Sequence, residues 1–425
     1  MISDRIKKHK VCIIGLGYVG LPLAVLTSKK YKVVGFDQDA LKIEKLKNGV
    51  DDSNEISKKD ISSSNILFTN KEKDLKNSDF YIVTVPTPVK KNNEPDLRYL
   101  KNASKLIGRV ISKNDIVIFE STVYPGVTEE ICVPIIEKQC NLKLNKGFFA
   151  GYSPERVNPG LQGKNISDIV KVVSGSDNKT AKKVNSFYES IISAGTYLAP
   201  SIKVAEASKV IENIQRDLNI ALMNEISIIF DSLDINTSEV IATASTKWNF
   251  LKFSPGIVGG HCIGIDPYYL TFESMRHGHI PDLILTARNL NEKMSKHIYD
   301  RTLKGVKKKK IINKSLKVLL LGYTFKEDCR DTRNTKVLDI AKLFTKNHHK
   351  VHIYDPLISE QNINIPNLKF LSSPKLNFYD VILFCVPHTK LKKIGLKKLK
   401  SYGKKKHYFF DIKSVFKKFE VDDQL

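Results

Sequence analysis

Gly15-Leu16-Gly17-Tyr18-Val19-Gly20 follows the apolar run 11–14 and opens a segment of helical periodicity that ends near residue 29. A second apolar run, 32–36, leads directly to Asp37. In such a strand–turn–helix–strand unit, the first glycine permits a tight turn, the second lets the backbone approach a pyrophosphate, and the third lets helix and strand pack closely. A carboxylate about 20 residues further on hydrogen bonds a ribose diol and repels a 2′-phosphate. The stretch therefore predicts a parallel-sheet domain that binds NAD in preference to NADP.

The same scheme recurs near the other end of the chain. Apolar strand-like runs occupy 316–321, 350–354 and 380–386, with a helical segment at about 334–347. Val33-Val34-Gly35-Phe36-Asp37 corresponds to Val351-His352-Ile353-Tyr354-Asp355, and 79–86 corresponds to 380–387. Near-continuous apolar strands alternating with helices indicate buried parallel sheets. We therefore expect a second doubly wound α/β domain, which lacks the full glycine fingerprint.

A long helix is predicted between the two α/β regions. Residues 201–233 keep helical periodicity without an internal Gly or Pro, whereas the average helix has about 11–12 residues. A helix of this length spans domains or packs against a copy of itself. The predicted fold is thus two Rossmann-like doubly wound parallel-sheet domains joined by a long central helix and a helical dimerisation domain. The predicted bounds are 1–199, 200–312 and 313–425.

Composition excludes several classes of protein. The 425 residues are 41% hydrophobic and 27% charged, as in a folded globular protein, and we expect no membrane span because uninterrupted apolar runs are short. The net charge of +24 comes mostly from Lys, which favours a solvated surface that attracts a polyanionic substrate over nucleic-acid binding. The six cysteines are scattered singly, so we expect no disulfide framework, no metal site and a reducing cytoplasm.

One cysteine has a distinctive setting. Cys262 lies in Gly259-Gly260-His261-Cys262-Ile263-Gly264-Ile265-Asp266, within a Gly-, Pro- and aromatic-rich segment, 248–269, that is predicted to be a structured loop. Flanking glycines let a substrate approach the sulfur, and a carboxylate four positions on could manage a proton or a water. A nucleophile and a purely structural glycine turn both fit this pattern.

Two polar residues of the predicted long helix also attract attention. Lys209 and Asn213 are four residues apart and share one face. They fit an ordinary polar stripe, or a cation and an amide donor that stabilise an oxyanion and lower the pKa of a thiol.

Over essentially its whole length the chain resembles the UDP-glucose/GDP-mannose dehydrogenase family. Within the family it is most similar to the UDP-N-acetylhexosamine 6-dehydrogenases, particularly the UDP-N-acetylglucosamine enzymes of Vi-type capsular polysaccharide synthesis. The motifs that carry the resemblance are Gly15-Leu16-Gly17-Tyr18-Val19-Gly20-Leu21-Pro22, Val85-Pro86-Thr87-Pro88, Glu120-Ser121-Thr122-Val123-Tyr124-Pro125-Gly126, Gly151-Tyr152-Ser153-Pro154-Glu155-Arg156, Ala205-Glu206-Ala207-Ser208-Lys209, Gly259-Gly260-His261-Cys262, and Gly322-Tyr323-Thr324-Phe325-Lys326 leading to Asp331-Thr332-Arg333.

The resemblance implies a four-electron oxidation at C6 of the sugar, with Cys262 attacking the C6 aldehyde to form a thiohemiacetal and then a thioester. Tethering the reactive aldehyde keeps it from leaving between the two oxidations. The implied product is a UDP-N-acetylhexosaminuronic acid for surface polysaccharide synthesis, and the implied assembly is a homodimer or higher homo-oligomer. The implied catalytic residues are Thr122, Glu155, Lys209, Asn213, Cys262 and Asp266, with Glu155 as general base in hydrolysis.

The resemblance also assigns binding residues to NAD and to the nucleotide sugar. Positions for NAD are Gly15, Gly17, Tyr18, Val19, Gly20, Asp37, Lys42, Pro86, Thr87, Ser121, Thr122 and Arg333. Positions for the UDP-sugar are Glu155, Arg156, Lys209, Asn213, Phe253, Gly256, Gly259, Lys326 and Lys413. His261 and Pro267-Tyr268-Tyr269 are typical of N-acetylhexosamine enzymes, whereas Cys329-Arg330 and Lys413 depart from the commoner family pattern.

Other readings remain. UDP-N-acetylgalactosamine, UDP-N-acetylmannosamine or UDP-glucose are alternative substrates. A two-electron hydroxyacid or sugar-alcohol dehydrogenase would need neither Cys262 nor the second nucleotide domain. A catalytically silent nucleotide-sugar-binding protein would have no reason to combine Cys262 with Lys209, Asn213 and Asp266.

Overall fold

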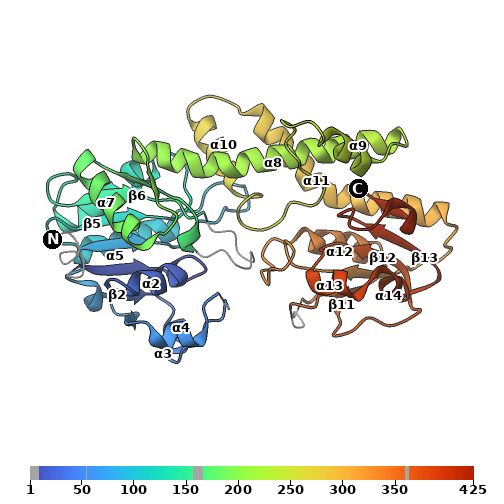
Figure 1. Cartoon of the computed structure of the whole chain (residues 1–425), viewed down its shortest axis with the longest axis horizontal. Coiled ribbons are helices and arrows are strands. Elements are labelled where there is room, and N and C mark those ends of the chain that lie inside the picture. The colour runs from blue at the N-terminus through green and yellow to red at the C-terminus, as the bar shows by residue number, and fades with distance from the viewer. Residues whose placement is uncertain (1–8, 54, 157–165, 359–362) are drawn as a thin grey trace. The chain divides into compact units, whose positions relative to one another are not determined.

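The computed structural model describes residues 9–53, 55–156, 166–358 and 363–425 (Figure 1). They separate into two compact units. The first contains the chain up to Glu212 together with Tyr268–His279, and the second contains Asn213–Pro267 and Ile280–Leu425.

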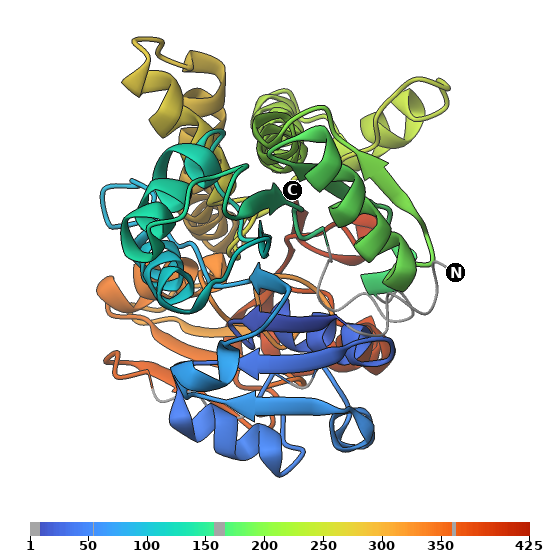
Figure 2. The same ribbon diagram turned by 90° about the vertical axis from the view of Figure 1, so that its left-hand side faces the viewer.

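The first unit is built on an eight-stranded sheet of order β3-β2-β1-β4-β5-β6-β7-β8, in which only the β6–β7 pair is antiparallel. Its first six positions follow the doubly wound order of dinucleotide-binding folds. Blue and light-blue arrows in Figure 2 show neighbouring strands of this sheet side by side. The strands are β1 (Lys10–Ile14), β2 (Lys32–Phe36), β3 (Ile66–Thr69), β4 (Phe80–Val83), β5 (Ile116–Phe119), β6 (Phe149–Tyr152), β7 (Lys171–Gly175) and β8 (Thr196–Leu198).

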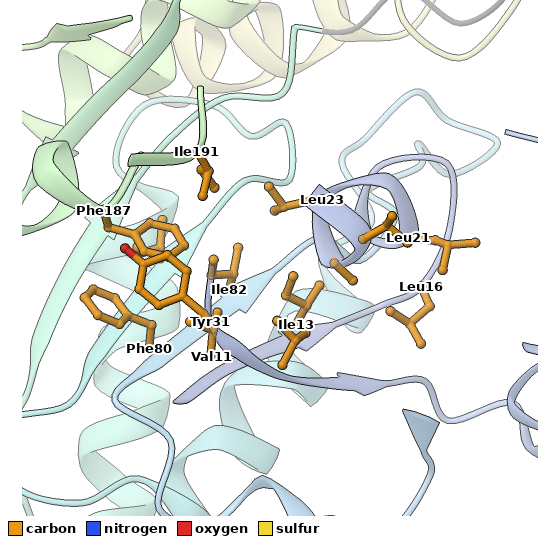
Figure 3. Packing of buried hydrophobic residues seen from close by; sticks show 14 of the residues in the cluster. Val11, Ile13, Leu16, Leu21, Leu23, Tyr31, Phe80, Ile82, Phe187 and Ile191 are labelled. Atoms are coloured by element: carbon orange, nitrogen blue, oxygen red, sulfur yellow. The ribbon is translucent and has the colours of Figure 1, made fainter. Parts of the chain in front are cut away.

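Helices cover both faces of this sheet because alternate strand residues point to opposite sides. Val11 and Ile13 of β1 pack with Leu23 of α2 and with Phe187 and Ile191 of α7 (Figure 3). Tyr81 points the other way, and its hydroxyl donates to the carbonyl of Val110 at the end of α5. The helices are α2 (Gly20–Ser28), α3 (Ala40–Lys47), α4 (Lys58–Ser63), α5 (Arg98–Val110), α6 (Val133–Cys140) and α7 (Asn178–Ile191), with short turns η1 (Glu72–Leu75), η2 (Val127–Cys132) and η3 (Ile166–Asp168).

The second unit repeats the architecture with a six-stranded, wholly parallel sheet of order β11-β10-β9-β12-β13-β14. Counted from β9, this order matches the first six positions of the sheet in the first unit. One face packs against α11 and α12 through Ile298 and Phe344, and the other against α13 and α14 through Leu391 and Leu399. The strands are β9 (Lys317–Leu321), β10 (Lys350–Tyr354), β11 (Leu368–Phe370), β12 (Tyr379–Phe384), β13 (Gly403–Asp411) and β14 (Asp423–Gln424).

The remaining helices include the predicted long one. They are α8 (Ile202–Ser232), α9 (Thr237–Ala244), α10 (Asp266–Arg276), α11 (Asp282–Lys308), α12 (Lys336–Lys346), α13 (Thr389–Ile394) and α14 (Leu396–Lys400), with the turn η4 (Lys418–Glu420). None of the helices in the described part of the chain is both long and apolar enough to cross a membrane. The prediction of two Rossmann-like units with a long central helix is confirmed; the three-domain bounds stay a prediction.

One predicted boundary is wrong. The loop expected over 248–269 ends at Ile265, because α10 begins at Asp266. An acidic residue in the first turn and Pro267 directly behind it are favourable helix-starting residues. This places Asp266 on a helix and brings the Cys262 turn directly before a helix start.

Candidate active site

The glycine turn of the first unit has the geometry that its sequence predicts. Gly15 has φ +96°, and its N–H donates to the carbonyl of Phe36 at 2.8 Å. A Cβ added to Gly20 would lie 1.8 Å from the carbonyl oxygen of Gly15, whereas one added to Gly17 would meet nothing within 4 Å. Gly15 and Gly20 are therefore required by the fold itself. Gly17 faces open space that a phosphate group can approach.

Asp37 is buried at the end of β2 and fixes this turn. Its Oδ2 accepts hydrogen bonds from the N–H of Leu16 and from Nζ of Lys42, both at 3.0 Å, and its Oδ1 accepts from the N–H of Asp39 at 3.1 Å. A cavity of about 500 Å³ opens beside the carboxylate. It is lined by Gly15, Asp37, Lys42, Pro86, Leu106 and Arg109, among others. A carboxylate beside an apolar wall fits the adenosine half of a dinucleotide.

The loops that follow β4 and β5 are tied together at the carboxyl end of the sheet, where doubly wound folds bind ligands. Ser121 Oγ donates to the carbonyl of Val85 at 2.6 Å, and Thr87 Oγ1 donates to the carbonyl of Thr122 at 2.7 Å. The hydroxyl of Tyr269 donates to the carbonyl of Thr87. The predicted residues Thr87, Ser121 and Thr122 thus lie together, while Tyr18 and Val19 lie half-buried at the start of α2.

Cofactor preference is the first prediction. Asp37→Ala should lower kcat/KM with NAD and relax the preference for NAD over NADP, because Lys42 loses its carboxylate partner and becomes available to a 2′-phosphate. Steady-state kinetics with both cofactors measures the ratio. The double variant Asp37→Ala/Lys42→Met should lose the gain with NADP. Equal kcat/KM for NAD and NADP in the unmodified chain would contradict the role given to Asp37.

In the second unit, the predicted substrate loop is held by a residue that the sequence analysis missed. Gly256 donates its N–H to Oδ1 of Asn224 at 2.7 Å, and Nδ2 of Asn224 donates to the carbonyl of Gly256 at 3.0 Å. Nδ2 also donates to Asn291 at 2.8 Å, and Asn291 donates to Asp217, which pairs with the buried Arg288. The buried side-chain amide of Asn224 therefore has hydrogen-bond partners for both its oxygen and its nitrogen, and it fixes the backbone at Gly256.

Lys413, one of the predicted cations of the UDP-sugar site, lies against this loop. A Cβ added to Gly256 would lie 2.3 Å from Nζ of Lys413, so the ammonium rests against the glycine backbone. Burial lowers the pKa of Lys413. Lys326 Nζ lies 5.7 Å from the centroid of the Phe325 ring. A Cβ on Gly259 would lie 2.8 Å from the carbonyl of Asn334, and Phe253 is half-buried at the start of the loop.

Arg333 is anchored within the second unit. Its guanidinium pairs with Asp331, with an Nη2–Oδ2 distance of 2.6 Å, and Nη2 lies 3.3 Å from Nδ1 of His261. Arg333 thus neighbours the residue that precedes Cys262. Its predicted contact with NAD stays a prediction.

Cys262 is half-buried on a turn that leads into α10. Its carbonyl accepts from the N–H of Ile265 at 3.0 Å and of Asp266 at 2.8 Å. Gly260 has φ +83°, and a Cβ there would lie 2.6 Å from the Phe325 ring, so only glycine fits. Asp266 and Asn213 are both buried, and Nδ2 of Asn213 donates to Oδ2 of Asp266. The structure thereby joins two predicted catalytic residues directly and places both in the unit that holds Cys262.

Thr122, Glu155 and Lys209 belong to the first unit. Glu155 accepts the N–H of Arg156 at 2.7 Å, and its Oε2 lies 3.5 Å from Nζ of Lys171. Arg156 also pairs with Glu212 at 2.8 Å. Lys209 is 9% exposed, and none of the described residues of its own unit forms a hydrogen bond or ion pair with its ammonium. A buried cation in that state is suited to an anionic ligand.

Lys171 and Glu120 are a second feature that the sequence analysis missed. Lys171 Nζ donates to Glu120 at 2.7 Å, and the hydroxyl of Tyr188 donates to the other oxygen of Glu120. Burial disfavours the charge of Lys171, but Glu120 and Glu155 outweigh it and raise the pKa of Lys171. Lys171 therefore stays cationic and holds Glu155 in place. The available signal was a charged residue directly after one buried strand, β5, and another at the first position of β7.

The first unit has the glycine turn and buried carboxylate of a dinucleotide-binding domain, and the second has a cysteine on a glycine-flanked turn. The chain belongs to the UDP-glucose/GDP-mannose dehydrogenase family, whose NAD binding domain matches residues 9–192, central domain 203–293 and UDP binding domain 319–418. It is an NAD-dependent nucleotide-sugar dehydrogenase, which confirms the resemblance and the cofactor predicted from the sequence.

Individual relatives match nearly end to end. The UDP-N-acetyl-D-glucosamine 6-dehydrogenase of Salmonella typhi is 46% identical over 426 residues, covering 99% of both chains. The enzyme of the same name from Pseudomonas aeruginosa is 47% identical, covering 99% of this chain and 100% of its own. The structure of a UDP-D-ManNAc dehydrogenase from Pyrococcus horikoshii superposes with a TM-score of 0.85 at 29% identity, covering 96% of both chains.

Proposed function

We propose that the chain oxidises the C6 hydroxymethyl group of a UDP-N-acetylhexosamine, with UDP-N-acetylglucosamine as the preferred substrate, to the uronic acid. The observation that carries the choice of sugar is the identity of 46% and 47% to relatives named as UDP-N-acetyl-D-glucosamine 6-dehydrogenases. A relative named as a UDP-N-acetyl-D-mannosamine dehydrogenase is 32% identical. The site supports the chemistry through Cys262, which lies on a glycine turn beside the Asn213–Asp266 pair.

NAD, when bound, accepts one hydride in each of two successive oxidations. In the proposed sequence, Sγ of Cys262 adds to C6 of the aldehyde and forms a thiohemiacetal. Loss of hydride from C6 gives a thioester, and water then cleaves the C6–S bond to release the carboxylate and restore the thiol. The net change removes four electrons from C6 and adds one oxygen from water.

The side chains act at two points, the oxyanion on C6 and the hydrolytic water. Lys209 supplies a cation, and Asn213 an amide donor, to the oxyanion on C6. Asp266 orients Asn213 through their hydrogen bond. Glu155, held by Lys171, takes the proton of the hydrolytic water, which Thr122 positions. Phe253, Gly256, Gly259, Lys326 and Lys413 bind the nucleotide sugar, with the two ammonium groups facing its phosphates.

The test is an assay of the purified chain with NAD and UDP-N-acetylglucosamine, UDP-N-acetylgalactosamine, UDP-N-acetylmannosamine or UDP-glucose. We expect the highest kcat/KM with UDP-N-acetylglucosamine and two NADH formed for each uronic acid. One NADH per sugar would identify a two-electron dehydrogenase. Failure to turn over any of these substrates would favour the silent binding protein.

We also propose that α8 forms a homodimer with a second copy. Its outer face carries Val204, Ile211, Leu222 and Ile229, which are 47%, 52%, 50% and 48% exposed and are spaced by 7, 11 and 7 residues. Its inner face carries the buried polar residues Glu206, Lys209, Asn213, Asp217 and Asn224. Exposed apolar residues in one stripe mark an interaction surface. Sedimentation should show a dimer whose dissociation is promoted by Ile211→Lys, and an unchanged state in that variant would contradict the interface.

A cytoplasmic location is proposed as well. A nucleophilic Cys262 functions only while its thiol is reduced, which favours a reducing compartment. The relative named Protein CapL, from Staphylococcus aureus, is 46% identical over 418 residues. A nucleotide-activated uronic acid made in that compartment would serve as a donor for surface polysaccharide synthesis.

A further inference from the structure

The second unit repeats the carboxylate that closes the glycine turn of the first. Asp355 follows β10 as Asp37 follows β2. Its Oδ2 accepts from the N–H of Tyr323 at 2.7 Å, and its Oδ1 from the N–H of Leu357 at 2.8 Å. These are the positions at which Asp37 accepts from Leu16 and Asp39. The two carboxylates occupy equivalent places in two equivalent folds.

Their surroundings differ. Asp37 borders the cavity of about 500 Å³ and pairs with Lys42, whose side chain is 37% exposed. Asp355 instead pairs with Nε2 of His388 at 2.9 Å, and both side chains are 0% exposed. His388 follows Val386-Pro387 after β12, the place that Thr87 takes after Val85-Pro86 in the first unit. The imidazole thus shields from solvent the carboxylate that would otherwise be available to a ribose diol.

The other ring nitrogen of His388 holds the loop that contains Lys326. The N–H of Asp328 donates to Nδ1 at 2.9 Å, so Nδ1 carries no proton and Nε2–H donates to Asp355. The carboxylate of Asp328 accepts from the N–H of Thr389 at 2.8 Å and from its hydroxyl. Thr324 Oγ1 lies 3.2 Å from Nε2 and donates to the carbonyl of Lys326 at 2.8 Å. Residues 323–328 are therefore fastened around one imidazole on both sides of Lys326.

We propose that His388 is a positioning residue for the uridine diphosphate site, acting through the loop 323–328 and Lys326. The inference rests on the proposed role of Lys326 in binding the nucleotide sugar. In the first unit the equivalent carboxylate borders the ligand cavity. In the second unit, the imidazole of His388 occupies the side of Asp355 that a ligand would otherwise approach. The same imidazole anchors the loop 323–328, which carries the ammonium of Lys326.

Calorimetry on the full chain tests this with UDP and NAD as separate probes. His388→Ala should raise the Kd for UDP roughly tenfold or more, because the loop that carries Lys326 loses its anchor. The Kd for NAD should stay within about twofold. A tenfold change in Kd corresponds to about 1.4 kcal/mol of binding free energy. His388→Asn keeps an acceptor for the N–H of Asp328, and His388→Gln keeps a donor to Asp355. Each should recover part of the lost UDP affinity, and both serve if the Ala variant does not fold.

His352→Ala is the matched control. His352 lies in the same unit and is half-buried, and its ring contacts Phe378 and the hydroxyl of Tyr379. Its removal should leave both Kd values unchanged. An unchanged Kd for UDP in the His388 variants, or equal weakening of UDP and NAD, would overturn the inference. An unmodified chain that binds NAD but no UDP would contradict the proposed function itself.

Discussion

Cys262→Ala should lower the production of uronic acid by several orders of magnitude, because without Sγ no thiohemiacetal or thioester can form. The first hydride transfer to NAD does not require the thiol. Binding of NAD and of the nucleotide sugar should also persist in this variant. The measurement is uronic acid formed per enzyme and per minute, with NADH followed in parallel. Trapping of a thioester adduct on the unmodified chain by mass spectrometry would give direct support.

Cys140→Ala is the matched control for this variant. Cys140 is also a half-buried cysteine, but it lies at the end of α6 and belongs to the first unit. Burial raises the pKa of Cys132 to about 12, and burial also raises the pKa values of Cys12 and Cys385, so these thiols are poor nucleophiles. Uronic acid formed by Cys262→Ala within tenfold of the unmodified rate would show that another route carries the second oxidation.

Lys209→Ala and Asn213→Ala should each lower kcat by roughly 10²–10³, the usual effect of removing one oxyanion donor. The loss should appear in kcat more than in KM, because the oxyanion develops only in the transition state. Asn213→Ala also leaves the buried Asp266 without that donor, so its melting temperature must be measured beside its kinetics. Lys203→Ala is a suitable control, since Lys203 lies on the same helix but is exposed and pairs with Glu130. A decrease of less than tenfold in a stable Lys209 variant would remove Lys209 from the proposed chemistry.

The fold was predictable from sequence because its central strands, β1, β4, β5, β9 and β12, are buried along nearly their whole length. The predicted runs 32–36 and 350–354 coincide with β2 and β10. In both, a Lys begins the strand and an Asp follows its last residue, and these charged residues mark the bounds of the apolar run. The start of α10 at Asp266 was missed, because Gly, Pro and aromatic residues nearby suggested a continuous loop. Long-range pairs were also missed. Asn224 with Gly256 and Lys171 with Glu120 join residues 32 and 51 positions apart, and no local pattern reports such contacts.

The site was predictable only in part for the same reason. Gly15, Gly20 and Asp37 act through short-range backbone geometry, which a motif records directly. His388 has a weaker signal: Asp355 aligns with Asp37 and Pro387 with Pro86, but the imidazole that meets Asp355 is separated from it by 33 positions. An internal repeat therefore indicates which positions of the two halves to compare. The residue that contacts the second carboxylate is identified only from the structure.

Asp37 and Asp355 both fasten the first amide beyond a glycine at the end of a strand. The carboxylate thus stabilises the turn in each half. Only in the first unit is it also proposed to contact a cofactor. An engineer who deletes Asp37 to change coenzyme choice would destabilise the turn at the same time. Asp37→Asn separates the two functions, since its amide oxygen can still accept from Leu16 while the negative charge is gone. Redesign of coenzyme choice in this scaffold should therefore begin from a neutral acceptor at position 37.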